Sequence, residues 1–127
     1  MLEPAIRDLA RGKNFAALTV IPANGHPMTH IMWIDADDEH ILVNTDLGRA
    51  KAAAMDADPR VTVAIWDNEN PYRYAEVRGR VVGTTAGPEA GAHIDALSQK
   101  YTGAPYAFGS TETRIIYRIE PIRQRGL

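Results

Sequence analysis

The chain has 127 residues, a formal net charge of −2 and no cysteine. Its 45% hydrophobic and 24% charged residues exclude intrinsic disorder, which requires low hydrophobicity and high net charge. The slight negative charge argues against a nucleic-acid-binding protein, and the absence of cysteine rules out disulfides and thiolate chemistry. The N-terminal segment lacks the basic and apolar regions of a signal peptide, and no apolar run approaches the roughly 20 residues of a membrane span. We therefore expect one soluble, cytoplasmic domain over residues 1–127.

The turn signals and the hydrophobic periodicity predict six strands and three helices. Pro4 is favoured in the first turn of a helix, and the dipeptide Asn24-Gly25 is a strong hairpin signal. Asp46 is the expected N-cap of a short Ala-rich helix. The predicted elements, in chain order, are a helix over 4–10, strands over 15–21, 28–35 and 40–45, a helix over 47–55, strands over 61–66 and 72–84, a helix from 88, and a strand over 113–120.

These elements predict a mainly β fold with minor α content. Short turns between most strands, and a long amphipathic helix inserted before the last one, favour a small closed or nearly closed six-stranded antiparallel barrel with helices at its ends. Gly79 is expected to mark a bulge or barrel corner in the long strand, and Pro121 to end the pairing of the last strand.

The most informative motif is the segment Asn44-Thr45-Asp46-Leu47-Gly48-Arg49-Ala50-Lys51. It places two cations in the first turn of a predicted helix, where the helix macrodipole normally favours acidic residues. Arg49 and Lys51, together with backbone N–H groups and the Thr45 hydroxyl, suit a bound phosphate or other polyanion. The alternative is a solvated helix face that carries two ordinary cations.

Large side chains cover both faces of the predicted strand over 28–35. Alternation places His30 and Met32 on one face and Ile31 and Trp33 on the other. A flat aromatic ligand would stack against such a strand. The alternative, which the usual burial of these residue types favours, is that Trp33 belongs to the core and His30 is a hydrogen-bonded interior or interface histidine.

Trp66 and Tyr74 flank an aromatic-rich loop, which suits either the mouth of a ligand site or a dimer interface. Lys100 and Tyr101 precede a Gly/Pro/aromatic loop, which is either a helix terminus or a lid over a pocket. The four histidines have no metal-ligand spacing, so no metal site is expected. Dinucleotide, P-loop and nucleophile-elbow motifs are absent as well, so that any enzymatic chemistry is expected to come from a cofactor.

Taken in order, these motifs resemble the pyridoxamine 5′-phosphate oxidase-like split β-barrel flavoproteins. Within that superfamily the chain is most similar to small proteins that use the deazaflavin coenzyme F420. The resemblance covers roughly residues 13–123. The segments that carry it are Asn24-Gly25-His26-Pro27, the strand with Trp33, Asn44-Thr45 with Arg49 and Lys51, Asp58-Pro59-Arg60-Val61, Tyr74-Ala75-Glu76-Val77-Arg78-Gly79-Arg80-Val81, Lys100-Tyr101, and Arg118-Ile119-Glu120-Pro121.

The resemblance implies an FMN-binding split-barrel type of fold and a homodimer with two cofactor sites at its interface. The ring would lie against the second and third strands, and the cofactor phosphate would meet the segment around Thr45. Trp66 and Tyr74 would close the site from around the interface, and Arg123 and Gln124 would approach the ring end. The residues implied for the cofactor site are His30, Met32, Trp33, Asn44, Thr45, Arg49, Lys51, Trp66 and Tyr74.

Three functions follow from the resemblance and the motifs. The first is an F420-dependent oxidoreductase that transfers hydride to an electron-poor acceptor such as a quinone, an enone or a tetrapyrrole. The second is an FMN-dependent oxidoreductase of the same fold. The third is a non-catalytic protein that binds a cofactor or a tetrapyrrole, because no catalytic dyad is evident in the sequence.

Overall fold

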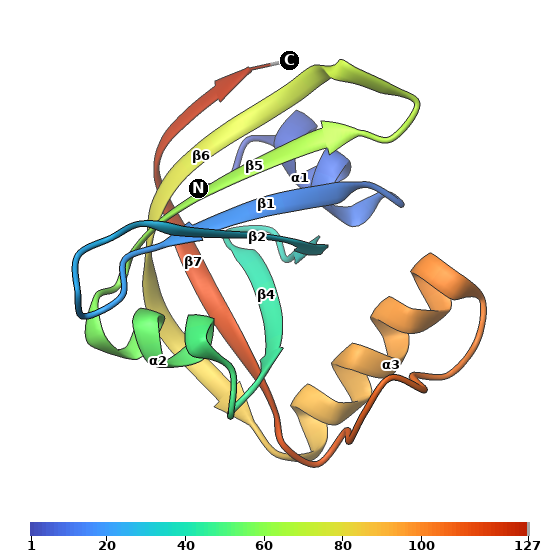
Figure 1. Ribbon diagram of the computed structural model, residues 1–127. Helices are drawn as coiled ribbons and strands as arrows, with labels where there is room; N and C mark the ends of the chain where they lie inside the picture. The colour runs from blue at the N-terminus through green and yellow to red at the C-terminus, as the bar shows by residue number, and fades with distance from the viewer. Residues whose placement is uncertain (127) are drawn as a thin grey trace.

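The computed structural model describes residues 1–126 and shows three helices around one curled antiparallel sheet (Figure 1). The mainly β antiparallel architecture predicted from the sequence is confirmed. No helix in this part of the chain has both the length and the apolar character needed to cross a membrane. The elements are α1 (Pro4–Arg11), β1 (Phe15–Val20), β2 (Met28–Trp33), β3 (Asp35–Ala36), β4 (Ile41–Asp46), α2 (Ala50–Ala57), β5 (Arg60–Asp67), β6 (Asn70–Ala86), α3 (Pro88–Thr102) and β7 (Arg114–Gly126).

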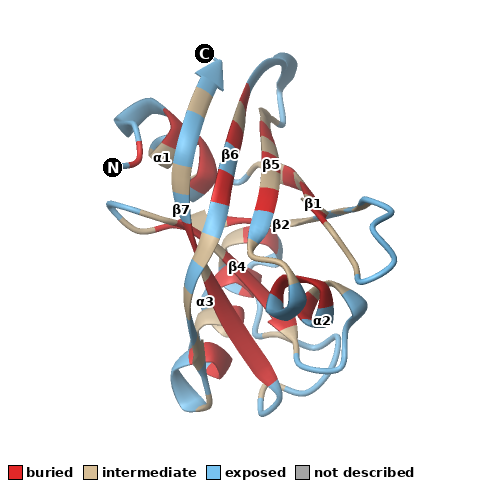
Figure 2. Cartoon of the chain, turned by 90° about the vertical axis from the view of Figure 1, so that its left-hand side faces the viewer, coloured by how far each residue is buried: buried red, intermediate tan, exposed pale blue. Residues whose placement is uncertain are grey.

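The strand order in the sheet is β2-β1-β5-β6-β7-β4-β3. The long β6 strand pairs with β5 through its first part and with β7 along residues 75–86, so that it joins both halves of the sheet. β7 lies between β6 and β4 and is buried over its first half and largely exposed over its second half (Figure 2). The curl of the sheet encloses the main hydrophobic core, which is built from alternating positions of the strands.

The helices close the openings that the curled sheet leaves. α1 packs against β3 and β5, and α2 packs against β1 and β4. α3 contacts β4, β6 and β7 and carries a second, smaller cluster, in which Ile94, Leu97 and Tyr101 pack against Phe15 and Trp33. The 4-3-4 spacing of Ala90, Ile94, Leu97 and Tyr101 predicts one buried face of this helix, and all four residues are buried in the structure.

The sheet has seven strands rather than six, because the predicted strand over 28–35 is interrupted at Ile34. The Ile34 N–H donates to the Tyr101 hydroxyl (3.1 Å), and the Ile34 carbonyl accepts from Lys100 Nζ (2.6 Å). Side chains of α3 therefore take the hydrogen bonds that a neighbouring strand would otherwise make. After this interruption the short β3 strand pairs with β4 instead of β1.

The short helix after β4 begins later than the sequence predicts. Asp46 is not its N-cap: the Asp46 carboxylate accepts from the Gly48 N–H (3.0 Å) and from the Thr113 hydroxyl (2.7 Å). The Leu47 N–H donates to the Thr113 carbonyl (2.9 Å), which keeps this segment attached to the start of β7. α2 therefore begins at Ala50, with Arg49 in extended conformation at the N-cap.

The end of β7 also differs from the prediction. Pro121 does not end the pairing, and β7 continues beside β6 to Gly126. Pro121 lies opposite Gly79, where the register of β6 and β7 shifts. A proline is tolerated at such an irregularity because no regular ladder hydrogen bond is required of its missing N–H. The bulge predicted at Gly79 is confirmed by the same register shift.

Gly79 is required by the close approach of β7. A Cβ atom at this position would lie 2.5 Å from the Glu120 carbonyl oxygen and 2.7 Å from Ile119 Cγ2. We expect Gly79→Ala to lower the free energy of unfolding by about 2–3 kcal/mol, because the backbone of β7 must move to make room. Urea denaturation measures the loss. The control is Gly48→Ala, whose Cβ would meet nothing closer than 3.6 Å, and equal stability of the two variants would contradict this explanation.

Candidate functional site

A pocket of about 240 Å³ lies where α2, α3 and the ends of β2, β4 and β7 come together. The connection between α3 and β7, residues 103–113, supplies part of its wall. The pocket combines cationic, amide and hydroxyl groups with aromatic and aliphatic side chains. Its lining residues are Met32, Trp33, Asn44, Thr45, Arg49, Lys51, Ile94, Leu97, Tyr106, Phe108 and Arg114.

Three cations line this pocket: Arg49, Lys51 and Arg114. Burial lowers the pKa of Lys51, and the neighbouring charges of Arg49 and Arg114 lower it further. Arg114 is buried, with 9% of its surface exposed, and within residues 1–126 it forms no ion pair with a carboxylate. A buried cation without a paired anion is costly, so this cluster suits an anionic ligand group.

The nearby carboxylate of Asp46 is already engaged by other groups. The hydrogen bond from the Gly48 N–H, followed by that from the Thr113 hydroxyl, lowers the pKa of Asp46. These two contacts hold the carboxylate at the junction of β4 and β7, outside the set of residues that line the pocket. The lining itself is therefore cationic, although the whole chain has a slight negative charge.

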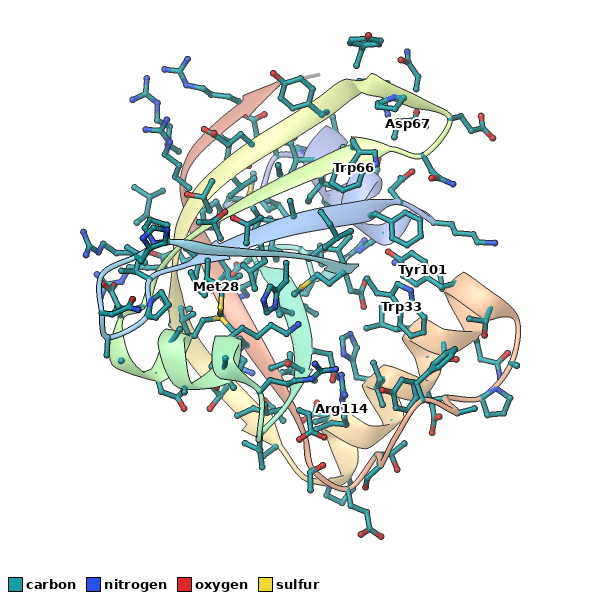
Figure 3. All side chains as sticks on the ribbon, in the orientation of Figure 1. Met28, Trp33, Trp66, Asp67, Tyr101 and Arg114 are labelled. Atoms are coloured by element: carbon teal, nitrogen blue, oxygen red, sulfur yellow. The ribbon has the colours of Figure 1, made fainter. Side chains whose placement is uncertain are left out.

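The apolar wall of the pocket is built around Trp33. Its ring stacks on Tyr101 with the ring centroids 5.1 Å apart and an interplanar angle of 3°. Tyr106 and Phe108 meet the Trp33 ring edge to face, at centroid distances of 6.3 and 6.1 Å. Phe108 is 72% exposed, so this side of the wall is open to solvent. Figure 3 shows Trp33 beside Tyr101, with Arg114 below them.

Six of the nine site residues predicted from the sequence line the pocket: Met32, Trp33, Asn44, Thr45, Arg49 and Lys51. His30, Trp66 and Tyr74 do not. Trp66 and Tyr74 pair across β5 and β6, and Figure 3 shows Trp66 on the far side of Trp33 from Arg114. Tyr74 is 54% exposed on the outer part of β6.

The packing agrees with the predicted division of β2 into two faces. Met32 packs against the main core, whereas Trp33 lies in the smaller α3 cluster beside Phe15, its partner on β1. Ile31, on the same face of the strand as Trp33, is 62% exposed. Met32 and Trp33 both line the pocket, which lies at the end of β2.

Five residues that line the pocket were not predicted from the sequence as site residues. They are Arg114, the α3 side chains Ile94 and Leu97, and the aromatic residues Tyr106 and Phe108. The interpretation of the segment after Tyr101 as a lid gave a partial signal for the two rings. The apolar periodicity of α3 predicts burial of Ile94 and Leu97 but not their contact with a ligand site, and the structure places them both in the α3 cluster and in the pocket lining. Arg114 opens an apolar strand, and nothing in its local pattern distinguishes it from a solvated terminal residue.

The sequence of residues 2–122 matches the family described as "Pyridoxamine 5′-phosphate oxidase". The chain belongs to the pyridoxamine 5′-phosphate oxidase family. Among curated proteins, none matches the chain. Structural comparison agrees with the family assignment: an F420 reductase is similar at 26% identity, with a TM-score of 0.84 and 98% of each chain covered. This agreement confirms the predicted resemblance and the split-barrel class of the fold.

Two further solved structures show how widely this fold of the pyridoxamine 5′-phosphate oxidase family is shared. A conserved hypothetical protein from Mycobacterium tuberculosis is 26% identical, with a TM-score of 0.73, covering 98% of this chain and 83% of that one. The heme storage protein HutZ from Vibrio cholerae is 14% identical, with a TM-score of 0.67, covering 98% and 94%. At that identity the second likeness concerns the fold alone.

Proposed function

We propose that the chain is an oxidoreductase that uses reduced coenzyme F420 to transfer hydride to an electron-poor organic acceptor such as a quinone, an enone or a tetrapyrrole. The observation that carries the proposal is one pocket in which Arg49, Lys51 and the buried Arg114 accompany an aromatic wall. The family supports an oxidoreductase, and the similarity to an F420 reductase supports the deazaflavin.

The residues of the pocket fit such a cofactor. The three cations would hold its anionic part through charge-assisted hydrogen bonds. Trp33, Ile94 and Leu97 would lie against its ring system and exclude water from the reacting face. When bound, the reduced deazaflavin supplies the hydride. The chain contributes affinity, orientation of the ring and shielding from solvent, and this division of labour agrees with the absence of a catalytic dyad in the sequence.

A homodimer is part of the same proposal. Trp66 and Tyr74 lie away from the pocket of their own chain, so that they would close a site only in a second copy. Ile31 on β2 and Ile122 on β7 are 62% and 66% exposed, and a second subunit would cover such aliphatic side chains. We expect light scattering to give twice the mass of the chain. A monomer that binds the cofactor fully would remove Trp66 and Tyr74 from the site.

The deciding experiment is a titration of cofactor-free protein with coenzyme F420 and, separately, with FMN, followed by the fluorescence of each ligand. Tight binding of F420, followed by turnover with a panel of quinones and enones, supports the proposal. Preference for FMN would move the chain to the flavin-dependent enzymes of the fold. Tight F420 binding without turnover of any acceptor would favour a carrier protein, and binding of neither cofactor would overturn the proposal.

The lowered pKa of Lys51 predicts a pH dependence of cofactor binding. Lys51 must be protonated to attract an anion, and burial among cations makes it lose its proton below the usual range of a lysine. We therefore expect F420 affinity to fall as the pH rises toward that range. Lys51→Arg is the matched variant, because arginine keeps its charge throughout. An identical alkaline loss of affinity in both proteins would show that Lys51 is not its source.

A further inference from the structure

A chain of hydrogen bonds runs from β3 to the buried arginine of the pocket. His93 Nε2 lies 2.9 Å from Asp35 Oδ2, and His93 Nδ1 lies 3.0 Å from Asn44 Nδ2. Asn44 Oδ1 accepts from Arg114 Nε at 2.9 Å. Asn44 and Arg114 line the pocket, whereas His93 and Asp35 stand behind them. His93 and Asp35 have no part in the function proposed above.

The arginine determines which atom is the donor and which the acceptor in each of these hydrogen bonds. Arg114 only donates, so the atom of Asn44 that it meets must be the carbonyl oxygen. The Asn44 amide nitrogen then faces the other way, where it donates to the Ala90 carbonyl (3.0 Å) and to His93 Nδ1. His93 Nδ1 must therefore be unprotonated. The imidazole carries its proton on Nε2 and donates it to the Asp35 carboxylate.

The charges around His93 agree with this arrangement. Burial raises the pKa of Asp35, but the hydrogen bond with His93, a backbone hydrogen bond and the charge of Lys100 outweigh that effect and lower it. Asp35 is thus an anion that accepts from the imidazole. Lys100 donates to the carbonyls of Ile34 and Ala10 and so stays fixed beside Asp35. Of the charged groups, Asp35 on β3 contacts the imidazole directly, Arg114 on β7 is joined to it through Asn44, and Lys100 on α3 acts on Asp35. Glu89 precedes His93 by one turn of the same helix.

A proton on His93 Nδ1 would be incompatible with this series of hydrogen bonds. Two N–H donors would face each other across 3.0 Å, and relief would require the Asn44 amide to rotate. Rotation would turn the amide nitrogen toward Arg114 Nε, where a second pair of donors would meet. The neutral Nε2-protonated form of His93 is therefore the one that supports Arg114.

We propose that His93 is a positioning residue: through the Asn44 amide it holds Arg114 in the orientation in which the guanidinium binds an anionic group of the ligand. Within residues 1–126, three of the five N–H groups of Arg114 are used. Nε donates to Asn44 Oδ1 at 2.9 Å, and the two terminal nitrogens each make one longer contact of 3.4 Å, with the Asn44 carbonyl and with the Tyr106 hydroxyl. The remaining two are available to the ligand. The identity of that ligand rests on the proposed function, whereas the order of the hydrogen bonds does not.

The test compares two substitutions of His93. His93→Leu removes the acceptor for the Asn44 amide, whereas His93→Asn offers a carbonyl oxygen near the place of Nδ1. We expect His93→Leu to weaken F420 binding about tenfold and His93→Asn to remain within about twofold of the wild type. Gln99→Leu, at an exposed position of the same helix, controls for a leucine on α3. Equal affinity of His93→Leu and the wild type would overturn the proposal.

Two measurements on the ligand-free protein separate this proposal from the F420 assignment. Nitrogen-15 NMR of the wild type reads the tautomer of His93, and a proton on Nδ1 would overturn the proposal even if the leucine variant failed to fold. Hydrogen exchange of the Arg114 Nε–H should be slow in the wild type and in His93→Asn, and faster in His93→Leu. The wild type could bind neither cofactor and still show the Nε2-protonated tautomer of His93 and the expected exchange rates of Arg114. In that case the proposed function would be wrong, and the positioning of Arg114 by His93 would be supported.

Discussion

Replacing both Arg49 and Lys51 by alanine is expected to weaken coenzyme F420 binding about 100-fold or more. Each charge-assisted hydrogen bond contributes about 1.5–3 kcal/mol, and the exposed Arg49 is expected to contribute less than the half-buried Lys51. Folding should change little, because neither side chain forms a hydrogen bond or an ion pair within residues 1–126. Fluorescence titration of the double variant measures the loss.

The matched control for this variant is Lys13→Ala with Arg80→Ala. It removes the same two positive charges from exposed positions outside the pocket. We expect the control to bind F420 almost as tightly as the wild type, because screening by salt weakens attraction over such distances. Equal losses in the two double variants would mean that only net charge matters. Wild-type affinity of the Arg49/Lys51 variant would remove the anion site from the proposal.

Substitution of Tyr101 is expected to have the largest effect on stability. Its ring joins α3 to Phe15 and Trp33, and its hydroxyl donates to the Asn14 carbonyl and accepts from the Ile34 N–H. Burial raises the pKa of this hydroxyl to about 12, so it stays protonated over the working range of pH. We expect Tyr101→Ala to lower the free energy of unfolding by about 3–5 kcal/mol.

Tyr101→Phe divides this effect into its two parts. The ring stays, but the Ile34 N–H and the Asn14 carbonyl lose their partner, and we expect a loss of about 1–2 kcal/mol. Urea denaturation measures both variants, with Gln99→Ala at an exposed position of α3 as the control. If Tyr101→Phe were as destabilising as Tyr101→Ala, the hydroxyl would account for the whole effect and ring stacking for none of it.

The fold could be predicted where local pattern and tertiary environment agree. The strand periodicity around Val61 and the buried face of α3 are both patterns of this kind, and the structure has them where the sequence indicates. The interruption of the second strand could not be predicted, because the Ile34 backbone is bonded by Lys100 and Tyr101, more than 60 residues away. The late start of α2 has a similar cause in the bond between Asp46 and Thr113.

The site was predictable to the extent that its residues are close in sequence. Thr45, Arg49 and Lys51 form one short segment, and the unusual placement of two cations there was visible in the chain itself. Arg114 and His93 reach the same region through the pairing of β7 with β4 and the packing of α3. Their contribution depends on hydrogen bonds between elements that are distant in sequence, for which the local pattern of the chain carries no signal.

The central place of β7 in the sheet has a consequence for the folding of the protein. Within residues 1–126, β4 and β3 join the rest of the sheet only through β7. Until β7 docks, β2, β1, β5 and β6 form one incomplete sheet, and the edges of β6 and β4 are without a partner strand. Arg114 is on β7, so the sheet and the cationic pocket are completed in the same step.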